Sequence, residues 1–230
     1  KGKTALGGDN RTAVACIVTI VETILRDKLQ HPPLTLLFTV GEEVGLKGAR
    51  QVKAIDLGKP AMGFNYDGGD PARITIGATG ADRWQAEIQG VSAHAGVHPE
   101  DGVSAALIVS KAITEIAAKG YFGAVRKGKK SGTSNIGPMQ GGEATNQVTD
   151  LMKLRGECRS HDAAFLDRIT GTWRSSFEKA AASVKNAAGE CGKVRFTASR
   201  DYHSFEMRTD SQVVRKSKEE VEKLGLEPEL

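Results

Sequence analysis

Hydrophobic and polar residues along the first seventy positions form blocks that suit alternating helices and strands. Apolar side chains recur at helical spacing over residues 12–30, and Asn10 or Thr12 is placed to cap this helix. Leu34–Val40 is a continuous apolar run of strand length, and residues 61–66 form a second, shorter one. Helices that alternate with buried apolar strands predict a parallel sheet.

From about residue 74 the pattern becomes typical of an α+β domain. Apolar residues alternate in segments that predict half-buried strands, and two longer segments have the apolar stripe of amphipathic helices. In chain order these are a strand at 84–88, a helix at 101–119, strands near 133–137 and at 152–158, a helix at 162–188 and a strand at 194–198. The order β-α-β-β-α-β predicts a ferredoxin-like domain.

We therefore expect an α/β domain with an incomplete parallel sheet over residues 1–73, which carries an inserted ferredoxin-like α+β lid domain over 74–206. Residues 207–230 are expected to return to the first domain, with a helix at 211–225 and no following strand. Since Lys1 is no initiator Met, we interpret the chain as an internal part of a longer protein.

Composition narrows the classes of function. The chain has 230 residues, a net charge of +4 and no apolar run near the roughly 20 residues that cross a bilayer, so we expect no membrane partner. The basic run at 126–130 lacks interleaved aromatic residues, which favours a solvated loop over a nucleic-acid site. Its three cysteines are scattered without a CxxC pair, which suggests a reducing, cytoplasmic location.

Acidic residues stand at the turns that follow the predicted strands of the first domain. Glu42 and Glu43 come directly after the apolar run that ends at Val40, and Asp9 and Asp67 lie in two other Gly-containing turns. Three carboxylates that converged at one sheet edge would repel each other unless cations were present, and a pair of divalent metals is a known hydrolytic device. Glu42, beside the ligand Glu43, is then free to accept a proton.

Each acid also has a structural interpretation. Glu42 and Glu43 suit the N-terminus of a helix because of its dipole. Asp9 suits a turn or a helix cap, and Asp67 an Asp-Gly turn.

Six motifs in one order give the chain a resemblance to a known family. It resembles the co-catalytic two-zinc exopeptidases that include peptidase T and carboxypeptidase G, and most closely the peptidase T-like branch. The segments are GDNRTA at 8–13, GEEVG at 41–45, NYDGG at 65–69, GVSAHAG at 90–96, GGEATN at 141–146 and GECRSHD at 156–162.

The resemblance implies a metal centre in the first domain. Asp9 matches the aspartate that bridges two zinc ions, and Glu43 and Asp67 match the terminal ligands of the two ions. Glu42 matches the general base. The implied activity is hydrolysis of amide bonds in short peptides by a metal-activated water, with two Zn²⁺ in each complete subunit or other divalent metals in their place.

The resemblance also implies roles in the lid domain and a homodimer formed through it. His94 matches a histidine that reaches the partner protomer's active site and stabilises the oxyanion. Asn146 and Arg159 match residues that hold the substrate. Each has a structural alternative, because His94 and Asn146 can serve their own loops and Arg159 can pair with Glu157 or Asp162.

Two parts of the family pattern are missing from these 230 residues. The family has a His-X-Asp motif before the bridging aspartate and another histidine ligand after the lid, and neither is found here. Zinc normally takes about four ligands, so we expect weak metal binding and no activity from the chain as given. Two other functions stay open: a non-catalytic lid and dimerisation module, and a basic binding module at residues 126–130.

Overall fold

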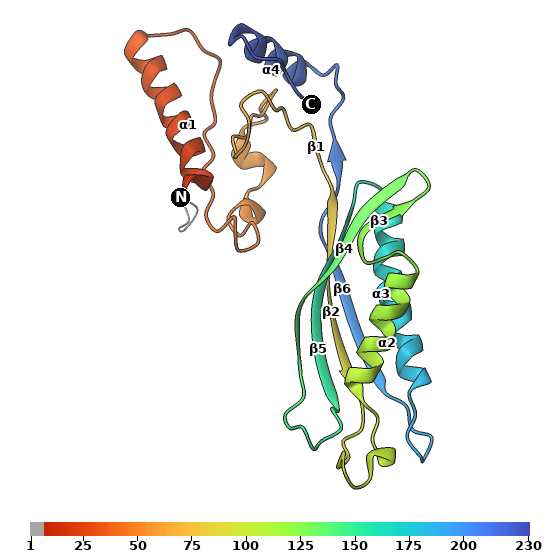
Figure 1. The fold of residues 1–230 in the computed structure, drawn as a ribbon. Helices are drawn as coiled ribbons and strands as arrows, with labels where there is room; N and C mark the ends of the chain where they lie inside the picture. The colour runs from red at the N-terminus through yellow and green to blue at the C-terminus, as the bar shows by residue number, and fades with distance from the viewer. Residues whose placement is uncertain (1–6) are drawn as a thin grey trace. The chain divides into compact units, whose positions relative to one another are not determined.

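The computed structural model describes residues 7–230, which divide into two compact units (Figure 1). Unit 1 combines the N-terminal part of the chain, up to Thr75, with Arg208–Leu230. Unit 2 is the intervening segment Ile76–Met207.

Unit 2 is an antiparallel sheet covered on one face by two helices (Figure 1). In its described residues the strand order is β3-β4-β5-β2-β6. Helices α2 and α3 pack on the same face, so no helix of residues 76–207 covers the opposite face of the sheet. The elements are β2 Gly80–Gln89, α2 Ala105–Ala118, β3 Gly123–Lys127, β4 Lys130–Gly141, β5 Leu151–Ser160, α3 Ala163–Ser183 and β6 Lys193–Tyr202.

An aromatic cluster forms the centre of the core between sheet and helices. Because strand side chains alternate between faces, Trp84 points toward the helices and is 1% exposed. Its ring centroid lies 4.9 Å from that of Trp173 on α3 and 5.5 Å from that of Phe196 on β6. Gly156 pairs with Trp84 across the strands, and a Cβ there would lie 2.2 Å from the indole Cζ2. Only glycine therefore leaves room for the indole at this position.

Side-chain caps set where the two helices begin. The Ser104 hydroxyl accepts a hydrogen bond from the Leu107 amide at 3.2 Å, and the Asp162 carboxylate accepts one from the Phe165 amide at 2.7 Å. Helix α2 therefore begins at Ala105, later than its predicted start at residue 101.

The basic run at 126–130 is part of a β-hairpin, so its interpretation as a loop was wrong. Lys127 pairs with Lys130 across a two-residue turn in which Gly128 has φ +61°. Val125 is fully buried and holds β3 on the core, while the lysines remain exposed.

Unit 1 lacks the predicted parallel sheet in its described residues. Leu34–Val40 and residues 61–66 are not hydrogen-bonded strands, because no described segment pairs with them. Their side chains consequently stay open to solvent, and Phe38 is 51% exposed. The alternative interpretation of Glu42 and Glu43 as the N-terminus of a helix is also wrong, since turns and short 3₁₀ helices follow them. The elements of unit 1 are α1 Gly8–Asp27, η1 Ala49–Gln51, η2 Ala54–Leu57 and α4 Gln212–Lys223.

Backbone pairing joins the distant ends of each unit. In unit 2, β1 (Gly77–Ala78) pairs with β7 (Phe205–Glu206). In unit 1, the Ile74 amide donates to the Glu229 carbonyl at 2.7 Å, and the Glu229 amide donates to the Ala72 carbonyl at 2.9 Å. None of the helices in residues 7–230 combines the length and apolar character that a membrane crossing requires.

Candidate functional site

The acidic residues of unit 1 act on one another electrostatically. The pKa of the Glu43 carboxyl lies above its ordinary value, chiefly because of the negative charge of Asp9 and then that of Glu42. Partial desolvation, a hydrogen bond with Asp9 and the charge of Asp67 raise it further. The structure therefore brings these four side chains, which we call the acidic group, within interaction range.

Asn10 ties together two of the turns that carry the acidic group. Its side-chain oxygen accepts a hydrogen bond from the Ala13 amide at 3.1 Å, which caps the regular part of α1 directly after Asp9. Its side-chain nitrogen donates to the Tyr66 carbonyl at 2.8 Å, directly before Asp67. The Asp67 carboxylate also accepts a hydrogen bond from the Gly68 amide at 2.8 Å, as in the alternative interpretation of an Asp-Gly turn.

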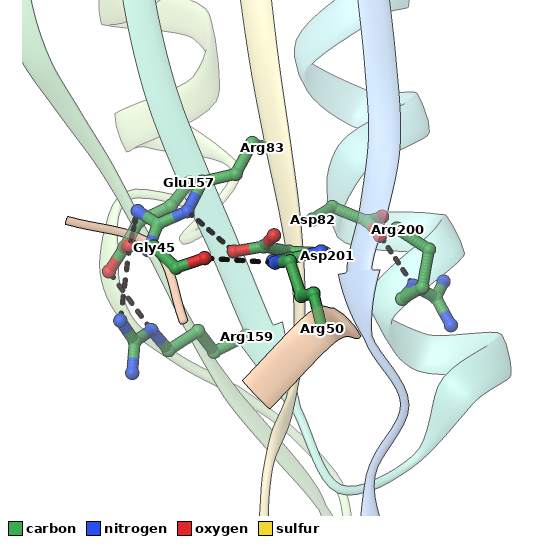
Figure 2. Close-up of polar contacts among 8 residues, drawn as sticks. All are labelled: Gly45, Arg50, Asp82, Arg83, Glu157, Arg159, Arg200 and Asp201. Carbon is green, nitrogen blue, oxygen red and sulfur yellow. Dashed lines mark hydrogen bonds and ion pairs between the residues drawn. The ribbon is translucent and has the colours of Figure 1, made fainter. Parts of the chain in front are cut away.

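Glu42 and Glu43 lie on a compact turn. The amides of Gly45 and Leu46 donate to the Glu42 carbonyl at 3.0 and 2.9 Å, and the Arg50 side chain donates to the Gly45 carbonyl at 2.9 Å (Figure 2). These bonds fix the backbone that presents the two carboxylates.

The donor chemistry of the acidic group suits a divalent cation, because its oxygens are hard ligands and their mutual repulsion would fall on binding. Its geometry is less complete. In the part of the chain that the structure describes, no three His, Cys, Asp or Glu side chains are arranged to hold a metal ion. The acidic group thus supplies negative charge and oxygen ligands, but its side chains are not arranged as a preformed metal site.

Two loops of unit 2 bring His94 and Asn146 together. The Ala95 amide donates to the Asn146 carbonyl at 2.9 Å, and His94 pairs with Gln147 in an isolated antiparallel bridge. The Gln147 side-chain nitrogen adds a 2.9 Å hydrogen bond to the Ser92 hydroxyl. Two motifs that are about fifty residues apart in the sequence therefore form one local structure.

A backbone contact orients the His94 ring. The Gly96 amide donates to Nδ1 of His94 at 3.2 Å. A ring nitrogen that accepts a hydrogen bond carries no proton, so in the neutral imidazole the proton lies on Nε2. His94 can then offer an N–H donor at its outer nitrogen.

Arg159 lies at the other end of the sheet and is held by Glu157. Its guanidinium donates to the two Glu157 oxygens at 3.0 and 3.2 Å, which is one of the structural alternatives given for it above. This bond raises the pKa of Arg159. Arg83 also contacts Glu157 and reaches Asp201 at 3.3 Å (Figure 2).

The length of β5 separates Arg159 from the loops that carry His94 and Asn146. Residue 151, next to these loops, pairs with Gln89, whereas Arg159 pairs with Ala81. Eight residues of strand span about 26 Å.

A buried polar cluster that the sequence pattern did not predict lies between β2, β6 and α3. Asp82 is 5% exposed and accepts hydrogen bonds from Arg200 at 2.5 Å and from the Thr170 hydroxyl at 2.7 Å. Arg200 also reaches Asp167 at 2.6 Å, and its bond to Asp82 raises its pKa. The available signal was Asp82 itself, an acid at a buried position of an alternating strand.

Comparisons with known proteins agree with the two units. The family described as Peptidase dimerisation domain matches residues 76–185, and the family described as M42 glutamyl aminopeptidase matches residues 4–63. Unit 2 thus contains the segment that is similar to a peptidase dimerisation domain, and the first stretch of unit 1 is similar to an aminopeptidase family.

Matches that extend over nearly all of this chain specify the family. The uncharacterized protein YqjE of Bacillus subtilis is 31% identical over all of this chain and 58% of its own length. A solved tripeptidase of Staphylococcus aureus has a TM-score of 0.85 and 31% identity, with 98% of this chain and 57% of that chain covered. The aminopeptidase PepT of Bacillus cereus has a TM-score of 0.83 and 30% identity, with 100% and 58% covered. The chain belongs to the peptidase T-like family and spans somewhat over half the length of these relatives.

Proposed function

We propose that the protein hydrolyses peptide bonds of short peptides in a metal-dependent reaction. Family membership supports this proposal, as do the two similar solved structures, which are named as a tripeptidase and an aminopeptidase. The observation that carries it is the acidic group, in which Asp9, Glu42 and Asp67 all raise the pKa of Glu43. A bound cation would relieve this mutual repulsion.

Within the acidic group we assign separate roles. Asp9, Glu43 and Asp67 would hold the metal, which polarises the scissile carbonyl when bound. Glu42 accepts the proton of the attacking water and delivers it to the leaving amine. Asp9 and Glu43 are not available for this proton transfer, because their oxygens serve as ligands.

In unit 2 we assign substrate contacts to three residues. Nε2–H of His94 donates to the developing oxyanion, a role that its hydrogen bond from Gly96 favours. Asn146 holds the substrate backbone, and Arg159 holds a carboxylate through its planar guanidinium. Before the substrate binds, Glu157 holds the Arg159 guanidinium in position.

The separation along β5 supports a homodimer in this proposal. A tripeptide spans at most about 11 Å, so it cannot touch His94 and Arg159 of the same copy across about 26 Å. A substrate that uses both contacts must take them from two protomers. We assign the dimer contact to unit 2, whose strand order supports a ferredoxin-like lid with β3 added at one edge.

Hydrolysis of tripeptides by the zinc-loaded protein tests the assignment. We expect Glu42→Gln to lower kcat at least about 100-fold with bound metal unchanged, because the general base is lost and the ligands are not. Asp67→Asn should lower the measured zinc content. Glu22→Gln, an exposed acid on α1, is the matched control. Full activity of the Glu42→Gln variant would refute the assignment.

A second function is favoured by the absence of a preformed metal cage in residues 7–230. On this view the 230-residue chain is a non-catalytic lid and dimerisation module. Zinc titration of this chain by calorimetry separates the two, since tight binding of two ions would exclude the second function.

We also propose a cytoplasmic location. In the described residues, Cys16, Cys158 and Cys191 are free thiols, which supports a reducing compartment.

A further inference from the structure

The face of the unit 2 sheet that carries no helix is polar. Buried residues of β2 and β5, such as Trp84 and Leu154, alternate with exposed ones, such as Gln85 and Arg155. We call this surface the open face and define it as the odd-numbered residues 83–89 of β2, 151–159 of β5 and 193–201 of β6.

The open face carries more positive than negative charge. Among these described positions every acid has a basic partner: Glu157 bonds Arg83 and Arg159, Asp201 bonds Arg83, and Glu87 lies 3.7 Å from Lys153. Three bases are left over. The basic residues are Arg83, Lys153, Arg155, Arg159, Lys193 and Arg195, and the acidic ones are Glu87, Glu157 and Asp201.

Arg155 is the left-over base at the centre of this face. Its cross-strand neighbour is Gln85 on β2, which in turn pairs with Thr197 on β6. Arg155 lines a shallow hollow of about 520 Å³ and a second one of about 380 Å³. Within residues 7–230 no hydrogen bond or ion pair engages its guanidinium. The larger hollow has the volume of a site for a small ligand.

The lining of the larger hollow favours an anion. Besides the guanidinium, it offers neutral hydrogen-bonding side chains on three strands, Gln85, Asn135, Thr197 and Ser199. Glu157 also lines it, but two arginines already neutralise that carboxylate. A planar guanidinium binds a carboxylate through two parallel hydrogen bonds, which makes a carboxylate the matching ligand.

We propose that Arg155 anchors the side-chain carboxylate of an acidic residue in a short peptide bound to the open face. The choice of a peptide rests on the proposed function, whereas the choice of a carboxylate rests on the hollow. The protein would therefore prefer peptides that contain Asp or Glu to their amide counterparts.

Direct binding tests this without turnover. Glycyl-glutamyl-glycine and glycyl-glutaminyl-glycine, which differ only in the side-chain charge, are titrated by calorimetry into the Glu42→Gln protein. We expect the glutamyl peptide to bind roughly tenfold more tightly, as for one charge-assisted contact at an open site. Adding Arg155→Gln should abolish the difference, and Arg155→Lys should restore part of it. Lys193→Gln, an exposed base on the same face outside both hollows, should leave it intact.

The outcomes are distinct. Equal affinity for the two peptides, or a preference that survives Arg155→Gln while tryptophan fluorescence shows a folded domain, would overturn the proposal. Inorganic phosphate that displaces the glutamyl peptide at lower concentration than acetate does would assign the hollow to phosphate and also overturn it. A preference that depends on Arg155 in a protein that hydrolyses no peptide would uphold this proposal and reject the proposed function.

Discussion

Replacing Gly156 with alanine should destabilise unit 2 because the added methyl group has no space. A Cβ at this position would lie 2.2 Å from Cζ2 of Trp84 and 2.3 Å from the Asn135 carbonyl oxygen. The carbonyl belongs to the neighbouring strand, and the indole is wedged against Trp173 and Phe196. Since neither can move away freely, we expect a loss near the upper end of overpacking costs, about 3 kcal/mol. In a domain of this size that lowers Tm by roughly 10 °C.

Gly171→Ala is the matched control for this change. Gly171 lies inside α3, and a Cβ there meets nothing within 4 Å. Removing the glycine's extra freedom in the unfolded chain should stabilise the helix by about 0.5–1 kcal/mol.

Tryptophan fluorescence gives the readout. Both tryptophans of the chain, Trp84 and Trp173, lie in the core of unit 2, so their emission during thermal or urea unfolding reports that unit alone. If the Gly156→Ala and Gly171→Ala variants unfolded at the same midpoint, the steric argument would be refuted.

Three further predictions concern the buried cluster, the buried thiol and the pair of protomers. Arg200→Ala should lower the free energy of unfolding in urea by about 3 kcal/mol, because Asp82 stays buried without its cation. Arg208→Ala, at an exposed pair with Asp210, should lower it by under about 0.5 kcal/mol, and equal losses would contradict this reasoning. Burial raises the pKa of the Cys158 thiol from 9.0 to about 12, so the folded state keeps a proton that the unfolded state loses between these values. The stability that this thiol contributes is therefore complete below about pH 9 and declines as pH rises toward 12, and Cys158→Ala should remove this decline. At pH 8 a thiol reagent should label the exposed Cys16 and spare Cys158 until the protein unfolds. His94→Gln and Glu42→Gln proteins should each be inactive, but subunits mixed by refolding should recover roughly a quarter of wild-type peptidase activity, because half of the dimers then hold one intact site; no recovery would show that His94 acts within its own protomer.

The periodic spacing of apolar residues predicted the elements of unit 2 well, because each helix or strand there buries one face against the same core. The stripe of α3 and the alternation of β2 each required only that one face meet the core. The hairpin at Gly128 was not predicted. The charged residues near its turn indicated a loop, although Val125 beside them is buried.

Strands in unit 1 could not be predicted in the same way. An apolar run such as Leu34–Val40 indicates a preference, but a strand exists only where another backbone pairs with it. The described residues supply no such partner, so the run forms no strand and stays half exposed.

For the candidate site, the sequence motifs identified the residues but not the contacts between them. The coupling of Glu43 to Asp9 depends on a turn that Asn10 ties to Tyr66, a contact between residues far apart in the chain. The bond from Gly96 to the His94 ring depends on loop geometry, which no motif specifies. The pairing of Arg159 with Glu157 was among the stated alternatives because the two lie two residues apart on one strand face.

The pairing of β1 with β7 has a consequence for the order of folding. Unit 1 is built from two stretches of chain, and bringing Arg73 to Glu229 from an unfolded chain would require closing a loop that contains all of unit 2. The entropy cost of such a closure grows with loop length. Once unit 2 has folded, Gly77 and Glu206 already lie side by side, and the remaining loop is short. Folding of unit 2 therefore shortens the loop that unit 1 has to close, and it should precede and speed the joining of the two ends.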